Sequence, residues 1–194
     1  MDYRDGSVTL DLYRTDFLDQ VVVDRETPQI VSFYNLNGKS YANSLQVQFD
    51  YELIKRLDMR MAYRYYNVMQ QYNSGFKQKE LTSSHRAFIN FGYQSRNYWA
   101  YDFTLNWQGP KRIPKTNISD EAFSPSFFLM NAQISKSWNE RFDVYMGVEN
   151  LLNFKQKNAI QLANDPFNPD FDASLIWGPV FGRMTYAGIR YKLK

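Results

Sequence analysis

The residues Leu45-Gln46-Val47-Gln48-Phe49-Asp50-Tyr51-Glu52-Leu53 alternate strictly, with an apolar or aromatic side chain at each odd position and a polar one at each even position. Successive side chains of a β-strand point to opposite faces, so this spacing predicts a strand with one apolar and one polar face. The same alternation recurs at 57–65, 99–108, 142–149 and 187–194. No segment repeats apolar residues at the spacing of a helix. The pattern therefore predicts an all-β chain.

Extended along the chain, the same pattern predicts eight long strands in an antiparallel meander, at 7–23, 32–53, 57–70, 82–94, 98–109, 126–138, 141–153 and 182–194. Most of them exceed the roughly 5–6 residues that are usual for strands in soluble proteins. They match or exceed the roughly 9–11 residues that a tilted strand needs to cross a bilayer. Strand length therefore favours a membrane protein.

The connections between these strands are unequal. They are short at 54–56, 95–97 and 138–140, and the alternate connections are long, at 71–81, 110–125 and 154–181; the prolines lie in the longer links. Short turns at one end and long loops at the other are typical of outer-membrane barrels. We therefore expect part of a transmembrane β-barrel with short periplasmic turns and long extracellular loops. A soluble β-sandwich is the alternative, because aromatic residues can also fill a two-sheet core.

Composition narrows the possible functions. The chain has 194 residues, of which 44% are hydrophobic and 18% aromatic, a formal net charge of +3 and no cysteine. An aromatic-rich chain of low net charge is not disordered, and a chain without cysteine has neither disulfides nor thiolate metal sites. The near-neutral charge gives no reason to expect a nucleic-acid partner. The start, Met1-Asp2-Tyr3, has no signal-peptide pattern, so we expect a mature form or a piece of a longer protein.

The residue types that carry catalysis or metal binding are sparse. His85 is the single histidine and has no second imidazole with which to share a metal or a proton. The segment 164–172 is rich in Asp and Asn oxygens that could ligate calcium, but it lacks the glycine and glutamate pattern of an EF-hand loop. Phosphate-binding glycine motifs are missing as well. We therefore predict no enzyme activity, no catalytic residue, no cofactor and no metal site, with calcium in this loop left open.

A family resemblance emerges near the C-terminus. The run Gly147-Val148-Glu149-Asn150-Leu151-Leu152-Asn153, followed after a loop by Gly182-Arg183-Met184-Thr185-Tyr186-Ala187-Gly188-Ile189-Arg190-Tyr191, resembles the last two strands of TonB-dependent receptors. Upstream, the segments 13–22 and 41–44 resemble earlier strands of the same family. The resemblance covers nearly the whole chain and is to receptors of the Bacteroidetes type. It departs from the family pattern in that Pro179 does not adjoin the Gly-Arg pair and the chain ends Leu193-Lys194.

This resemblance implies that residues 1–194 are the C-terminal section of a barrel that has 22 strands in the complete receptor, with the plug domain and signal peptide absent. It implies a place in the outer membrane of a Gram-negative cell and a part in TonB-dependent uptake of a scarce nutrient such as a siderophore, a corrinoid or a glycan. The implied partners are outer-membrane lipid, the missing plug, the TonB complex acting through that plug, and the barrel-assembly machinery.

Two groups of residues are candidates for function under this resemblance. Loop aromatics would contact a ligand at the extracellular mouth or pack the loops against each other: Phe123, Phe127, Phe167, Phe171 and Trp177. The alternating end of the chain would act as an assembly signal through Gly188, Tyr191 and Leu193. The alternative reading is a stand-alone eight-stranded outer-membrane barrel with a structural or enzymatic role. The heavy mixed charge of the polar face argues against so narrow a lumen.

Overall fold

A computed structural model describes residues 6–119, 121–138 and 141–193. Eight long strands form one antiparallel sheet in the order β1-β4-β5-β7-β8-β9-β10-β11, and neighbours along the chain are neighbours in the sheet. The bounds are β1 (Gly6–Phe17), β4 (Ser40–Ile54), β5 (Leu57–Tyr72), β7 (His85–Gln94), β8 (Trp99–Gln108), β9 (Phe127–Trp138), β10 (Phe142–Glu149) and β11 (Met184–Tyr191). The predicted antiparallel meander of about eight long strands is confirmed.

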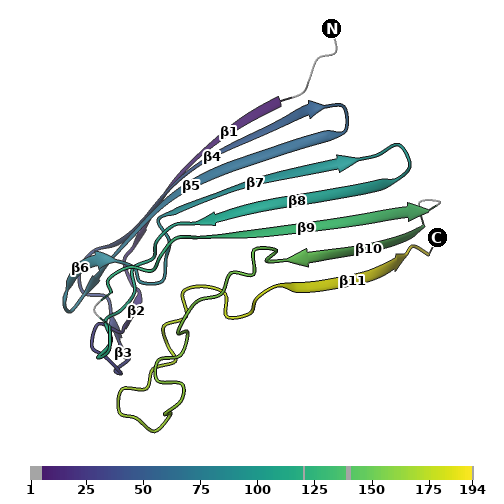
Figure 1. Cartoon of the computed structure of the whole chain (residues 1–194). Coiled ribbons are helices and arrows are strands. Elements are labelled where there is room, and N and C mark those ends of the chain that lie inside the picture. Colours follow the sequence, from purple (N-terminus) through teal and green to yellow (C-terminus); the bar gives the residue numbers. More distant parts are fainter. Residues whose placement is uncertain (1–5, 120, 139–140, 194) are drawn as a thin grey trace.

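The sheet is a single curved wall (Figure 1). The start of β1, the end of β11 and the short turns lie at one end of the wall, and the long connections gather at the other. Among the described residues, β1 pairs only with β4 and β11 pairs only with β10, so both edges of the sheet are open. No helix in the described part of the chain is long and apolar enough to span a membrane.

The strand register places the apolar residues of neighbouring strands on one common face. Val47 lies between Leu10 and Tyr63, and Leu105 lies between Ile89 and Met130. No second layer of described residues covers this face: Leu10 is 61% exposed and Ile189 is 72% exposed. A row of large apolar side chains facing outward is unfavourable in water and favourable in hydrocarbon. We call this surface the outer face and the opposite, polar surface the inner face.

The packed interior of the molecule lies at the loop end. Fully or almost fully buried apolar side chains include Val22, Ile113, Phe127 and Leu175, all at or beyond the ends of the long strands. The middle of the sheet contributes none of the buried apolar residues among those described. The loop end therefore buries its apolar groups as a water-soluble protein does, whereas the wall does not.

Two predicted strands are each divided in the structure. The segment predicted as 7–23 breaks after Phe17 and resumes as β2 (Val21–Asp24), and the segment predicted as 32–53 begins with β3 (Ser32–Asn35) and resumes as β4. The pair β2–β3 forms a separate two-stranded sheet. Gly38 has a φ of +130°, in a region that favours glycine, and this breaks the strand between β3 and β4.

Other boundaries differ by a few residues. A short strand, β6 (Gly75–Gln78), pairs with the end of β5 inside the predicted loop 71–81. The strand predicted as 141–153 ends at Glu149 because Asn150 has a φ of 52° and turns the chain. The strand predicted as 182–194 covers Met184–Tyr191, and residue 194 lies outside the described residues.

Two glycines of the inner face lie beneath tyrosine rings of the facing strand. Gly147 is the register partner of Tyr186, and Gly188 is the partner of Tyr145. A Cβ built on Gly147 would collide with the ring of Tyr186, and one on Gly188 would collide with the ring of Tyr145. The rings can lie flat across the strands only because these positions carry no side chain.

Candidate functional site

The loop end contains a cluster of charges centred on Glu26. Its Oε2 accepts a hydrogen bond from Lys77 Nζ at 2.6 Å, and its Oε1 accepts one from Arg112 Nη1 at 2.5 Å. Lys77 belongs to β6 and Arg112 to the segment 109–126 between β8 and β9. Burial opposes ionisation of Glu26, but the bonds from the two cations outweigh it and hold the pKa of Glu26 below its usual value. The carboxylate therefore joins three segments.

Further polar contacts surround this cluster. Arg25 Nε donates to Glu80 Oε1 at 2.7 Å, and Glu80 is almost fully buried. The Tyr34 hydroxyl donates to Asp24 Oδ2 at 2.5 Å and accepts from the backbone N–H of Asn73 at 3.0 Å. Burial, followed by the bond to the Asp24 carboxylate, raises the pKa of Tyr34. These bonds hold the β2–β3 hairpin against the end of the β5–β6 hairpin.

A second cluster at the loop end is aromatic. The rings of Phe127 and Phe154 are stacked with centroids 4.7 Å apart, and Trp177 lies against both at 6.0 and 6.4 Å. Lys111 places its Nζ 5.7 Å from the Phe127 ring and donates to the carbonyl of Trp177. Burial, and then the nearby charge of Arg86, lowers the pKa of Lys111. This cluster packs the segment 150–183 against the start of β9.

Two amide side chains give the long segment 150–183 its shape. Asn150 donates from Nδ2 to the carbonyl of Phe154 at 2.7 Å and accepts from the Phe154 N–H at 2.9 Å. Gln156 Oε1 accepts from the N–H groups of Trp177 and Gly178, and its Nε2 donates to the carbonyl of Leu175. Both amides are buried. The segment is therefore ordered by its own polar contacts without a helix or a long strand.

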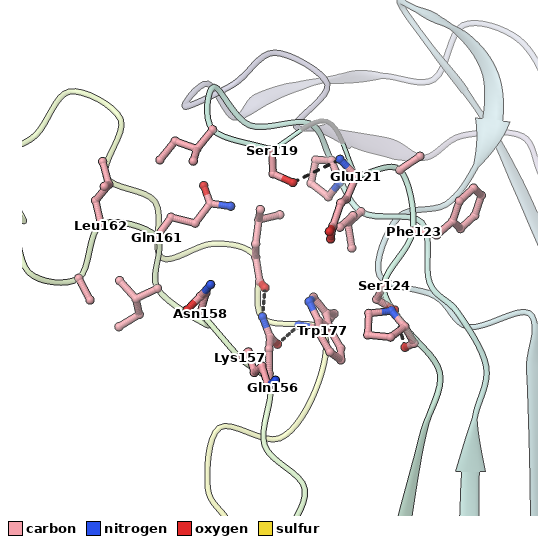
Figure 2. A pocket seen from close by; sticks show the side chains of 18 of the residues that line it. Ser119, Glu121, Phe123, Ser124, Gln156, Lys157, Asn158, Gln161, Leu162 and Trp177 are labelled. Atoms are coloured by element: carbon pink, nitrogen blue, oxygen red, sulfur yellow. Dashed lines mark hydrogen bonds between the residues drawn. The ribbon is translucent and has the colours of Figure 1, made fainter.

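A cavity of about 1110 Å³ lies between the segments 113–125 and 156–177. In Figure 2, Ser119 and Glu121 line one side, and Asn158, Gln161 and Leu162 line the other. Gln161 extends toward the facing loop, and its Oε1 is buried with no hydrogen-bond partner among the described residues. The lining is mixed: apolar groups from both loops surround amides and a few charges. A volume of this size suits a small organic molecule.

A second cavity, of about 440 Å³, lies between the turn that joins β2 to β3 and the segment 171–175. Pro114 and Lys115 form its third wall. Gln29 Nε2 donates to the carbonyl of Pro169 across this region. Both cavities are therefore walled by loops that come from distant parts of the sequence.

The predicted ligand-contact aromatics occupy different environments. Trp177 and Phe123 line the larger cavity, although Figure 2 shows the Phe123 ring turned away from the opposite loop. Phe171 lines the smaller cavity. Phe167 is 96% exposed, whereas Phe127 is 5% exposed within the aromatic stack. The structure thus brings Phe127 and Trp177 into contact, and it does not gather all five residues at one surface.

The predicted assembly-signal residues lie on or beside the last strand. Gly188 lies under the ring of Tyr145, and Tyr191 is the register partner of Phe142 on the outer face. Leu193 follows the end of β11 and is exposed. Tyr191 and Leu193 have the alternate spacing expected of the outer face. Their role in assembly stays a prediction.

His85 is the first residue of β7 and lies at the loop end of that strand. Its Nδ1 is 2.7 Å from the Tyr63 hydroxyl, and its ring lies 5.1 Å from that of Tyr65. Among the described residues, no three His, Cys, Asp or Glu side chains are grouped closely enough to hold a metal ion. In the segment 164–172, where calcium was left open, Asp165 accepts from Asn168 Nδ2, and Asp170 accepts from Asn117 Nδ2.

The inner face of the wall carries a polar network. Asp50 bonds Arg60 at 2.5 Å, Asn90 bonds Asp102 at 3.0 Å, and Tyr186 bonds Gln133 at 2.9 Å. The first two bonds connect adjacent strands, and the Tyr186–Gln133 bond reaches from β11 across β10 to β9. These polar groups lie on the side of the sheet opposite the apolar outer face. A face of this kind suits water or a polar domain.

The charge cluster at Glu26 was not among the sequence-based predictions. The charged residues 24–26 alternate in sign at the end of a predicted strand. The bonding partners of Glu26, however, lie on β6 and in the segment 109–126. A single sequence carries no signal that pairs residues so far apart. The buried amides of Asn150 and Gln156 were missed for the same reason, although the position of Asn150 at a strand end is typical of a turn residue.

Comparisons with known proteins identify the protein family. Residues 1–151 match the family described as TonB dependent receptor-like, beta-barrel, so the chain belongs to that family. The predicted outer-membrane location in Gram-negative bacteria is confirmed by this membership, and so is the prediction that the chain is part of a receptor barrel rather than an enzyme. A comparison with curated protein sequences finds no match.

Solved structures share the fold at low sequence identity. The copper transporter OprC is similar with a TM-score of 0.69 at 12% identity, over 98% of this chain and 29% of that one. A mutant of the ferric enterobactin receptor of Pseudomonas aeruginosa gives 0.65 at 13% identity, over 95% and 28%. The ferric preacinetobactin receptor of Acinetobacter baumannii gives 0.61 at 11% identity, over 96% and 27%. The chain therefore spans less than a third of the length of these receptors.

Proposed function

We propose that residues 1–194 are the C-terminal section of the barrel of a TonB-dependent receptor that takes up a scarce nutrient across the outer membrane. The observation that carries this proposal is the combination of an uncovered apolar face with two open sheet edges. Lipid would cover the outer face, and further strands of the same receptor would pair with β1 and β11. The family membership supports the same assignment.

A stand-alone eight-stranded barrel is the less favoured alternative. Closure of such a barrel requires the first strand to pair with the last. Here β1 and β11 are the opposite edges of the sheet among the described residues. The polar network of the inner face also suits a wide lumen that holds a plug domain better than an interior filled by packed side chains.

The loop end supports a role as part of the extracellular mouth. It carries the larger cavity, an aromatic side chain (Trp177) at its wall, and a buried acceptor (Gln161 Oε1) directed toward the opposite loop. An aromatic surface combined with amide groups suits an organic ligand such as a siderophore, a corrinoid or a glycan. Under this proposal Phe123, Phe167 and Phe171 also contact the ligand. Phe127 packs against the ring of Trp177 and holds it in place.

The proposed partners follow from the receptor assignment. They are outer-membrane lipid, a plug domain within the barrel, the TonB complex acting through the plug, and the assembly machinery reading the end that contains Gly188, Tyr191 and Leu193. A source among the Bacteroidetes remains an inference from the sequence motifs alone.

The proposal is tested by uptake in cells that lack the chromosomal receptor. A gene for the whole receptor, containing residues 1–194, should restore accumulation of a labelled nutrient, and loss of TonB should abolish it. Residues 1–194 alone should give none. Coupled, TonB-dependent uptake by residues 1–194 alone in liposomes or cells would contradict the proposal.

A paired substitution tests the ligand surface. Trp177→Ala in the whole receptor should weaken binding of the nutrient, whereas Trp99→Ala, at the opposite end of the wall on the outer face, should not change it. Equal ligand affinity in both variants would show that the larger cavity is not part of the binding site. It would not contradict the assignment of the chain to a receptor.

A further inference from the structure

Glu26 lies where three segments from distant parts of the chain meet. Its two carboxylate oxygens bond to Lys77 on β6 and to Arg112 in the segment 109–126, at 2.6 and 2.5 Å. We propose that Glu26 is a positioning residue that clasps the β2–β3 hairpin onto both the β5–β6 hairpin and the segment 109–126. This inference rests on the proposed function, because it takes these segments to form the mouth of the receptor.

The β2–β3 hairpin depends on such contacts for its orientation. It forms its own two-stranded sheet and connects to the wall through two short links, residues 18–20 and 36–39. The links bond to each other through the N–H of Leu36 and the carbonyl of Gln20 at 2.8 Å. The β2–β3 hairpin shares no strand pairing with the sheet of the wall. Its orientation relative to the wall therefore depends on contacts made beyond the two links.

The polar contacts farther out differ in how many segments they join. The Arg25–Glu80 pair and the Tyr34–Asn73 bond each join the hairpin to the region that follows β5. Glu26 joins the hairpin to that region and also to the segment 109–126. Loss of Glu26 would therefore uncouple two segments at once, whereas loss of a partner would uncouple one.

The charges make the carboxylate difficult to replace. The side chains of Glu26 and Arg112 are only 15% and 13% exposed, and that of Lys77 is 37% exposed. Without the negative charge, Lys77 and Arg112 would face each other as like charges with little water between them. An amide of the same size cannot balance two cations. Glu26→Gln should therefore loosen the β2–β3 hairpin from both other segments even though it preserves the shape of the side chain. Those two segments stay joined to each other, because Arg112 Nε donates to the carbonyl of Gln78 on β6.

This loosening has a consequence for ligand binding. The smaller cavity has the turn after β2 as one wall and Pro114 as part of another. Glu26 belongs to that turn, and Arg112 lies two residues before Pro114. The clasp thus fixes the distance between two walls of that cavity. A receptor without the clasp should bind its nutrient less tightly through a less organised mouth, as expected when preorganisation is lost.

The clasp can be measured by distances between spin labels in the whole receptor, embedded in outer-membrane vesicles. Residues 1–194 contain no cysteine, so introduced cysteines are unique within them. Exposed label sites are Thr27→Cys in the hairpin, Ser74→Cys between β5 and β6, and Ser126→Cys just before β9. Thr27 with Ser74 reports on one junction of the clasp, and Thr27 with Ser126 reports on the other.

The expected pattern is specific. Glu26→Gln should broaden both distance distributions and add a longer component. Lys77→Gln should mainly broaden the distribution from Thr27 to Ser74, and Arg112→Gln should mainly broaden that from Thr27 to Ser126. Asp16→Asn removes one member of the exposed Arg14–Asp16 pair on the wall and should broaden neither distribution, which makes it the matched control.

Two further measurements distinguish the failure of the proposal for Glu26 from the failure of the proposed receptor mouth. A pair of labels at Arg96→Cys and Ser126→Cys, at the two ends of the wall, should keep its distance in every variant, which excludes general unfolding. Labelling of Thr27→Cys by a membrane-impermeant reagent on intact cells tests whether the hairpin is extracellular. Unlabelled Thr27→Cys would overturn the proposed mouth, whereas unchanged distributions in Glu26→Gln would overturn the clasp alone.

Discussion

The wall and the loop end of this chain bury opposite kinds of surface. The wall exposes rows of Val, Leu, Ile, Met and aromatic residues on its outer face and joins its strands by polar contacts on its inner face. The loop end buries Val22, Ile113, Phe127 and Leu175 and bonds its polar groups around them. One chain therefore contains two folding environments, one suited to hydrocarbon and the other to water.

The amino-acid sequence specifies the two regions in different ways. In the wall, the pattern of side chains has period two, and every strand needs only its neighbour in sequence. In the loop end, stability comes from contacts between segments that lie far apart in sequence, such as Glu26 with Arg112 and Lys111 with Trp177. In the wall, the effect of a substitution on stability should therefore depend on which face carries the residue. In the loop end, it should depend on which distant residue the side chain contacts.

The largest effect is expected on the outer face of the wall. Leu105→Arg, between Ile89 and Met130, should lower the free energy of unfolding of the receptor by about 2–4 kcal/mol, because it would place a charge in hydrocarbon. Asn106→Arg, one residue away on the inner face, should cost much less. Denaturant titration of the receptor in lipid vesicles measures both, and equal costs would contradict the assignment of faces.

The next effect concerns the tyrosine that lies over a glycine. Gly147→Ala should lower the free energy of unfolding by about 1–3 kcal/mol, because the new methyl group collides with the ring of Tyr186. Gly92→Ala is the matched control on the same face, since a Cβ there meets nothing within 4 Å. The same titration compares them. A neutral Gly147→Ala would mean that the ring moves aside without cost.

A smaller effect is expected in the loop end. Asn150→Ala removes the bonds to both the N–H and the carbonyl of Phe154 and should cost about 1–2 kcal/mol of local stability. Asn158 has a similar positive φ, at 50°, in an exposed position, and its side chain makes no hydrogen bond to another described residue, so Asn158→Ala should cost less. Hydrogen exchange across 150–183 measures the difference, which would vanish if the turn conformation alone mattered.

The smallest effect is the pH dependence of the clasp. Because the pKa of Glu26 lies below its ordinary value of 4.5, the stabilisation that it gives is present above about pH 4.5 and disappears as the pH falls through the lowered pKa. The Thr27–Ser74 distance distribution should therefore stay narrow from neutral pH to about pH 5 and broaden in stronger acid. Broadening between pH 7 and pH 5 would contradict this sign.

Much of the wall could be predicted because its information is local. The run 45–53 alone indicates which side chains face outward, and the neighbouring alternations indicate the remaining strands. Prediction was less accurate at the break between β1 and β2, where the apolar run Val21-Val22-Val23 favours extended backbone although the chain leaves the wall. Periodicity indicates extended backbone but does not indicate which sheet the backbone joins.

The candidate site was less predictable. Loop aromatics could be picked out, yet whether a given ring is buried, as Phe127 is, or fully exposed, as Phe167 is, depends on which distant segment packs against it. The Glu26 cluster has no sequence motif, because its three charged residues are spread from position 26 to position 112.

Side-chain alternation and short turns are properties of neighbouring residues, and they are enough to specify the long strands, their order and the two faces of the wall. The tertiary structure alone decided that the β2–β3 hairpin leaves the wall, that Lys77 and Arg112 meet at one carboxylate, and that two loops enclose a cavity. Those features arise from the closing of long connections, where the partners are selected by geometry and charge in space rather than by spacing along the chain.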